Sequence, residues 1–207
     1  MPKQTFPSFE AFIEANRHAR LRQMVLGRDR GNWVLTHLMV NNLSVQWGEA
    51  GGKAVIEGAS RPGGLTIFLQ TRGAPAFSGN GRRFDDLSLM VAEPNDEFCL
   101  AADGGSRRWC SLYIPNGDLV GPSGDTTNRV GSMRGVFQLP PQRMERFRLV
   151  IEQLDEAVQQ APAVPVRIWR MGWTVAQEAP RVWPVGAHAR VRDQSYGRGH
   201  EGNAQVA

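Results

Sequence analysis

The two cysteines of this 207-residue chain, Cys99 and Cys110, lie on either side of a pair of glycines. If Gly104 and Gly105 form a two-residue hairpin turn, the two cysteines occupy directly opposed positions on adjacent strands. Opposed Cα atoms on antiparallel strands lie about 4.5 to 5.5 Å apart, a separation that a disulfide can span. The spacing therefore defines a candidate redox pair, although two cysteines make no disulfide scaffold and reducing conditions would favour free thiols.

Metal and nucleophile chemistry has weaker support in the residue pattern. No two of the four histidines, His18, His37, His188 and His200, form the His-x-His pair that projects two rings from one face of a strand. The sequence also has no Gly-x-Ser-x-Gly elbow, no P-loop and no Cys-x-x-Cys motif. We therefore predict no metal, no cofactor and no enzymatic activity.

The positive charge of the chain is concentrated near its end. The net charge is +4, but residues 1–162 carry 18 basic and 17 acidic residues, whereas residues 163–207 carry six and three. Cations and aromatic rings are interleaved in this tail, at Arg167, Trp169, Arg170 and Trp173. Single-strand nucleic-acid binders use such interleaving, but here the spacing is loose and no folded element is predicted around it. We expect the tail to be adventitious or membrane-adherent rather than a nucleic-acid binder.

Apolar residues follow a period of two between Gly31 and Pro115, which is typical of strands. Seven short runs rich in Val, Ile, Leu, Thr and aromatic residues are separated by turn-forming pairs such as Gly51-Gly52 and Gly104-Gly105. Seven or so strands at about ten-residue spacing predict a mainly β fold, a jelly roll or β-sandwich.

Helical patterns flank the strand region on both sides. Ser8 can cap a helix over FEAFIEANRHARLRQ, and Pro140-Pro141 can open a second helix over QRMERFRLVIEQLDEAVQQ. The predicted organisation is an N-terminal helix packed on the barrel (1–20), a β-barrel (21–118), a loop or linker (119–139), an amphipathic helix (140–161) and a poorly ordered basic tail (162–207).

One apolar seam runs along the second predicted helix, with members spaced three and four residues apart. It comprises Met144, Phe147, Ile151, Leu154 and Val158. Such a seam either packs on its own domain or pairs with a second copy. Two heptads alone make a weak coiled coil, which favours packing within the chain, but dimerisation through the seam stays open.

The ends of the chain carry no pattern typical of export or membrane insertion. The N-terminal residues lack the apolar core of a secretory signal. Nowhere does an apolar stretch approach the roughly 18 residues that a membrane-spanning helix needs. We expect a cytoplasmic protein with no membrane partner.

The central stretch GRRFDDLSLMVAEPNDEFCLAADGGSRRWCSLYIP resembles the N-terminal sensor domain of AraC-type transcription regulators. In that family a strand ending in proline leads to an acidic-Phe pair, a short polar hairpin and a Trp-containing strand that ends in proline. The matching residues are Pro94, Glu97, Phe98, Trp109 and Pro115, preceded by Leu87, Leu89 and Val91. The resemblance covers about residues 5–160 and rests on structural, not catalytic, motifs.

The resemblance implies a cupin-like barrel that binds a small effector, a following helix used for dimerisation and a C-terminal DNA-binding domain. That last domain, with two helix-turn-helix motifs, needs on the order of a hundred residues. Only 45 residues follow Pro162. We therefore expect a sensor half that does not bind DNA specifically, whether through a frameshift or truncation, as a naturally short regulator or through an artificial boundary.

Ligand contacts in such a barrel would come from inward-facing polar and aromatic side chains near one mouth. Our candidates are His37, Gln70, Phe77 and Trp109. The expected partners are an unidentified small-molecule effector and a second copy or a related regulator. Two alternatives stay open, a standalone cupin-like enzyme and a dimerisation partner that titrates full-length regulators.

Overall fold

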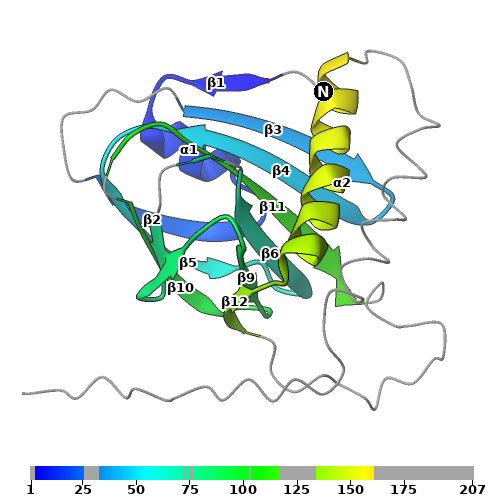
Figure 1. Cartoon of the computed structure of the whole chain (residues 1–207). Helices are drawn as coiled ribbons and strands as arrows, with labels where there is room; N and C mark the ends of the chain where they lie inside the picture. The colour runs from blue at the N-terminus through cyan, green and yellow to red at the C-terminus, as the bar shows by residue number, and fades with distance from the viewer. Residues whose placement is uncertain are drawn as a thin grey trace, which may run out of the picture.

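Two antiparallel sheets form the body of the protein in the computed structural model (Figure 1), which describes residues 3–25, 33–71, 73–74, 77–102, 104–116 and 134–160. The tail from residue 161 onward, with its interleaved arginines and tryptophans, lies outside the described residues. The prediction of a mainly β sandwich is confirmed.

All seven predicted strands are present. They are β3 (Trp33–Val40), β4 (Leu43–Ala50), β5 (Ala54–Ser60), β6 (Gly64–Gln70), β9 (Ser88–Ala92), β10 (Glu97–Ala102) and β11 (Arg107–Pro115). Five further strands escaped the prediction because they are short or were assigned to other elements. They are β1 (Gln4–Phe6), β2 (Ala19–Val25), β7 (Phe77–Gly79), β8 (Arg82–Phe84) and β12 (Gly135–Gln138).

The larger sheet has the strand order β1-β3-β4-β11-β6-β9-β12, and the smaller sheet has the order β2-β5-β10-β7-β8. The stretch GNGRRF contains the turn that joins β7 to β8, with Phe77 opposite Phe84. Asn80 and Gly81 both adopt positive φ angles, 50° and 74°. Positive φ at both central residues is typical of a tight two-residue hairpin turn.

The glycine pair Gly104-Gly105 does not form the predicted hairpin. β10 pairs with β5 and β7 in the smaller sheet, whereas β11 pairs with β4 and β6 in the larger one. The chain therefore crosses from one sheet to the other at the glycines, which have φ angles of 132° and 78°. Each strand finds its partners far away in sequence, so the local register that opposed the two cysteines is wrong.

The first helix is shorter than predicted. Ser8 caps it as expected, its Oγ accepting from the Ala11 backbone N–H at 3.3 Å. However, α1 spans only Phe9–Ala15, and the chain turns at Asn16 into strand β2. The Asn16 side chain accepts from the N–H groups of residues 18 and 19, which replaces the hydrogen bonds that a longer helix would have made.

The segment predicted as a linker, 119–139, contains the edge strand β12. Gly135–Gln138 pairs with β9 and extends the larger sheet at one side. Residues 117–133 lie outside the described part of the chain. The predicted helix after it is confirmed as α2 (Pro141–Gln160).

Helix α2 lies across the outer face of the larger sheet (Figure 1). All five members of the predicted seam are buried, from 0% exposed at Leu154 to 7% at Val158. They pack in one core cluster with outward-facing residues of β4, β6 and β11 such as Val45, Ile67 and Leu112. In the structure the seam therefore packs on its own domain and is not exposed for pairing with a second copy.

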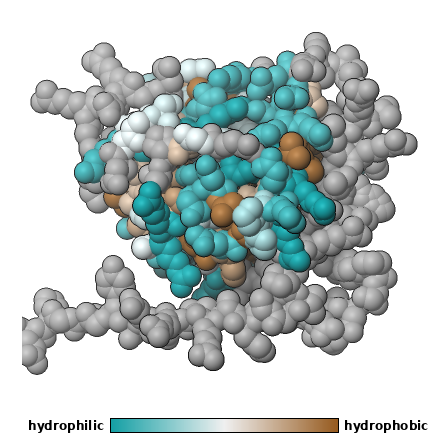
Figure 2. All heavy atoms as spheres, in the orientation of Figure 1, coloured by the Kyte–Doolittle hydropathy of each residue, from teal (hydrophilic) through white to brown (hydrophobic). Residues whose placement is uncertain are grey.

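The surface that α2 turns away from the sheet is largely hydrophilic where it is not grey in Figure 2. Leu149, on this side of the helix, is 46% exposed. The helix thus separates an apolar face toward the sheet from a polar face toward solvent, as its sequence period requires.

Leu154→Ala should lower the free energy of unfolding by about 2 to 5 kcal/mol, because it opens a cavity under α2. Leu149→Ala, on the same helix, removes a half-exposed side chain and should change it by about 0.5 kcal/mol at most. Urea unfolding of the two variants checks this contrast. Equal effects, or a midpoint that shifts with protein concentration, would contradict packing of the seam within the chain.

Candidate functional site

A cavity of about 80 Å³ lies between the two sheets. Small inward-facing residues create it, since five different strands each place an alanine on its wall. These are Ala19 of β2, Ala50 of β4, Ala54 of β5, Ala92 of β9 and Ala102 of β10. Larger side chains at these positions would fill the interior of so small a barrel.

Aromatic rings form much of the remaining wall. The Phe68 ring stacks on Trp109 with centroids 6.4 Å apart and a 28° tilt, and Phe77 meets Phe68 edge-on at 5.5 Å. Phe12 of α1 meets Trp109 edge-on at 5.9 Å, so the first helix contributes to the wall as well. The lining is therefore mainly apolar and flat-sided.

The position of Trp109 depends on a glycine on the neighbouring strand. Gly48 pairs directly with Trp109, and a Cβ atom at residue 48 would lie 2.2 Å from the Trp109 ring. Any other residue would push the indole out of place. Gly48 thus allows a large ring to lie flat along the inner face of the sheet.

Gln70 is the polar exception on the apolar part of the wall. It is 3% exposed, and its Oε1 has no hydrogen-bond partner among the described residues. Leaving a buried acceptor unpaired costs about 1 to 3 kcal/mol. A donor that approached this carboxamide oxygen would remove that cost.

Arg107 is a second polar residue on the cavity wall, at the start of β11. Its guanidinium donates to the backbone carbonyls of Gly52 and Gly104. These bonds hold together the β4–β5 connection and the crossing between β10 and β11. They also leave a positive charge beside the cavity.

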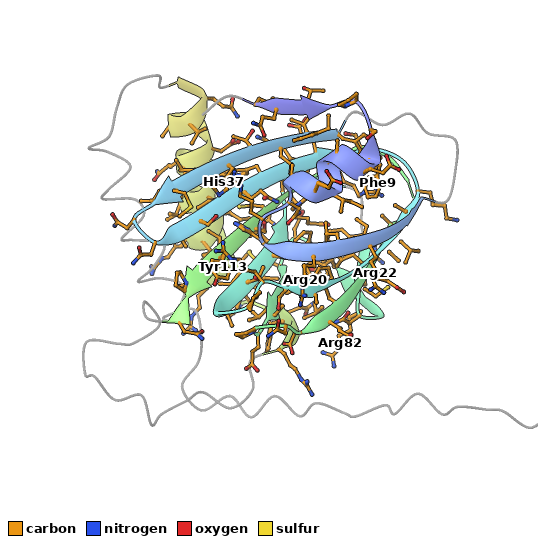
Figure 3. The ribbon with its side chains drawn as sticks, turned by 180° about the vertical axis from the view of Figure 1, so that it is seen from behind. Phe9, Arg20, Arg22, His37, Arg82 and Tyr113 are labelled. Atoms are coloured by element: carbon orange, nitrogen blue, oxygen red, sulfur yellow. The ribbon has the colours of Figure 1, made fainter. Side chains whose placement is uncertain are left out.

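A chain of four side chains forms a polar cluster at the other end of the interior. His18 Nδ1 lies 2.8 Å from Ser111 Oγ, and His18 Nε2 lies 2.6 Å from Ser44 Oγ. The Ser44 hydroxyl also lies 2.7 Å from His37 Nε2, so it bridges the two imidazoles. In Figure 3, His37 on β3 and Tyr113 on β11 lie at the same end of the sheet, away from Phe9 of α1.

Burial keeps the histidines of this cluster neutral. His18 is 2% exposed, and its burial, with smaller contributions from His37, Arg61 and Arg17, lowers its pKa to about 3. Burial also lowers the pKa of the half-buried His37, and the positive charges of Arg17 and Arg61 make smaller contributions in the same direction. A neutral His18 can donate from one ring nitrogen and accept at the other, as its two serine partners require.

Three of the four predicted ligand residues lie on the cavity wall. Gln70, Phe77 and Trp109 line it, whereas His37 belongs to the polar chain behind it. A binding role for any of them remains a prediction. The resemblance implied that Phe98 and Trp109 lie on two strands joined by a short hairpin. Both residues line the cavity, but their strands belong to different sheets.

His18 was missed because its segment reads as helix. The available signal was the alternation in Ala19–Val25, which places Ala19 and Leu21 on the cavity wall. Arg20 and Arg22 project from the other face of the same strand (Figure 3). A period of two in ARLR therefore pointed to a strand beginning beside His18.

The two cysteines lie in different sheets and are both free. Cys99 on β10 lies opposite Glu57 on β5. Burial of the thiol raises its pKa, and the nearby Glu57 carboxylate raises it further. Cys110 is fully buried under α2, and burial raises its pKa well above the usual value. Protonated thiols are poor nucleophiles, so neither the register nor the electrostatics supports the candidate redox pair.

The described part of the chain contains no group of three or more His, Cys, Asp or Glu side chains placed to hold a metal ion. Among the same residues, no helix combines the length and apolar character needed to cross a membrane.

The sequence matches no protein-family model and no curated protein. Among solved structures, the AraC-like transcriptional activator CuxR is similar over 78% of this chain, with a TM-score of 0.58 and 11% sequence identity. The chain spans 60% of the length of the CuxR chain. This chain therefore shares its fold with the matched part of CuxR, in agreement with the mainly β sandwich predicted from the sequence.

Weaker likenesses extend to other proteins. The cupin domain of Cnp3 from Schizosaccharomyces pombe matches 44% of this chain and 68% of its own, at 8% identity and a TM-score of 0.31. A structure from a study of the DMSP lyases RdDddP and RnDddQII matches 52% and 63%, at 16% identity and a TM-score of 0.34. Scores this low carry no argument about function.

His18→Gln should flatten the pH dependence of stability between pH 6.5 and 5. The unfolded chain protonates His18 near pH 6.5 and the folded chain only near pH 3, so wild-type stability falls as the pH drops through this window. One proton taken up on unfolding gives a slope of at most about 1.4 kcal/mol per pH unit.

Urea unfolding at a series of pH values measures this slope. His37→Gln is the matched control, because its half-buried ring should contribute a smaller part of the slope in the same direction. Identical slopes for wild type and His18→Gln would show that the folded protein does protonate His18 in this range.

Proposed function

We propose that this chain is a small-molecule-sensing regulatory domain of AraC type, with the ligand held in the cavity between the sheets. The observation that carries the proposal is an apolar cavity with a buried acceptor, Gln70 Oε1, that no described residue satisfies. A protein interior normally pairs such groups, and ligand sites combine apolar walls with a few polar anchors. The fold shared with CuxR supports a regulatory role.

The cavity is connected to α2 through strand β11. Trp109 and Ser111 face the cavity, while the alternate residues Cys110 and Leu112 pack under α2. Arg108, which also reaches the cavity wall, forms an ion pair with Asp155 of α2 at 2.6 Å. A ligand that moves Trp109 would therefore act on the strand that supports the helix, which is how occupancy would be transmitted.

An enzyme is the competing function, because Ser111 and His18 both line the cavity and form a serine–histidine pair. A general base works best with a pKa near the operating pH. The pKa of His18, about 3, makes it a weak base at neutral pH. The pair is therefore better suited to a fixed hydrogen-bond role than to activating a nucleophile.

The proposal includes the cytoplasmic location and the absence of specific DNA binding by this chain alone that were expected from the sequence. A heterodimerising partner remains an alternative, but it would not use the seam as packed here. Pairing through that seam requires α2 to leave the sheet and expose Leu154.

A thermal-shift screen over metabolites and metal ions tests the proposal. A compound at 100 times its dissociation constant stabilises the protein by about 2.7 kcal/mol, which is on the order of 5 to 10 °C for a chain of this size. The hits should not be consumed on prolonged incubation. Metal-dependent turnover of a hit would favour the enzyme instead.

Ala102→Phe should abolish the shift given by any such hit, because the ring would occupy the cavity from β10. Ala101→Phe is the matched control, since the adjacent strand residue points to the opposite face and does not line the cavity. Ala54→Leu provides a second filling variant should Ala102→Phe fold poorly. A shift that survives both fillings would place binding elsewhere.

A further inference from the structure

We infer that the cavity selects a small, flat, uncharged molecule that carries one hydrogen-bond donor, which the Gln70 carboxamide oxygen accepts. The inference rests on the proposed function and specifies the chemical class of its ligand. It follows from the shape, the polarity and the charge of the cavity wall, taken in turn.

The shape of the wall suits a single ring. Phe68 lies nearly parallel to Trp109 and nearly perpendicular to Phe77, so a planar guest meets both faces and edges. Aromatic rings attract one another in stacked and edge-to-face arrangements. An apolar cavity of about 150 Å³ in another protein binds benzene. At about 80 Å³, this cavity has roughly half that volume, so one small ring is the largest guest that it would admit.

The polarity of the wall calls for a donor. Gln70 pairs directly with Trp109 across β6 and β11, which places its carboxamide next to the aromatic wall. Its Oε1 is buried and unpartnered among the described residues, and an oxygen of this kind can only accept. A guest with an O–H or N–H group satisfies this oxygen, whereas a guest without one leaves it unpaired.

The charge of the wall disfavours ions of either sign. The cavity lining contains Arg107 but no Asp or Glu, so an ammonium group would meet a cation and no carboxylate on the wall. Arg108 also belongs to the lining, but its guanidinium is paired with Asp155 of α2. A carboxylate has no donor, and beside Gln70 Oε1 it would place one acceptor against another. Arg107 already donates to the carbonyls of Gly52 and Gly104, which directs part of its guanidinium away from the cavity. A neutral donor is the group that fits.

Four one-ring probes separate these properties: phenol, toluene, benzoate and benzylamine. Ligand-observed NMR on the full chain should show phenol binding about tenfold more tightly than toluene, since a satisfied buried acceptor is worth about one order of magnitude in affinity. Benzoate and benzylamine should bind more weakly than phenol. Equal binding of phenol and toluene, or stronger binding of either ion, would overturn the proposed ligand class.

Gln70→Leu should reverse the preference, so that toluene binds at least as tightly as phenol. Gln70→Met keeps the unbranched shape and serves if the leucine variant fails to fold. Gln46→Leu is the control, because Gln46 is equally buried on the inner face of β4 but does not line the cavity, and its preference should stay with phenol. A phenol preference that survives loss of the Gln70 carboxamide would assign the donor contact to another group.

The same experiment distinguishes this inference from the proposed function. If phenol fails while another compound binds in a manner that Ala102→Phe abolishes, the cavity senses a ligand of a different class and only the inference falls. If no compound shows binding that depends on Ala102, the cavity itself is not the site and the proposed function falls with it.

Discussion

The burial of the larger sheet on both faces is the constraint on which the rest of this structure depends. Strand β11 lies at its centre, hydrogen-bonded to β4 on one side and β6 on the other. Its even-numbered residues Cys110, Leu112 and Ile114 are 0 to 2% exposed beneath α2. Its odd-numbered residues face the interior between the sheets. Because one strand serves both faces, the helix side requires tight apolar packing while the inner side is free to carry a cavity and polar groups.

The sequence was sufficient for the features that depend on local chemistry. The period of two located seven strands, Ser8 located the start of α1, and the spacing from Met144 to Val158 located the buried face of α2. Each of these signals lies within one element, where the pattern of side chains directly reflects which face is buried. The same locality explains the failure at Gly104-Gly105, because partner choice between strands is decided by contacts across the whole sheet.

The cavity could be predicted only in part for a related reason. Aromatic and polar residues such as Gln70, Phe77 and Trp109 are easily recognised within a strand. A cavity, however, arises where side chains are small, and small residues give no such signal. Alanines from five strands meet around it, and no single stretch of sequence shows that they share a wall. The role of Gly48 could not be predicted from the sequence either. It depends on contact with Trp109, which comes from a strand about sixty residues away.

The interior combines two environments that need different physical support. At one end, the buried His18 ring is neutral, and two serine hydroxyls form hydrogen bonds with its ring nitrogens. This arrangement completes the hydrogen bonding of a buried polar chain without adding a charge. At the other end, the Gln70 oxygen has no such partner. The fold therefore pairs this polar cluster but leaves one buried acceptor without a partner beside the aromatic wall of the cavity, where a guest with a donor would satisfy it.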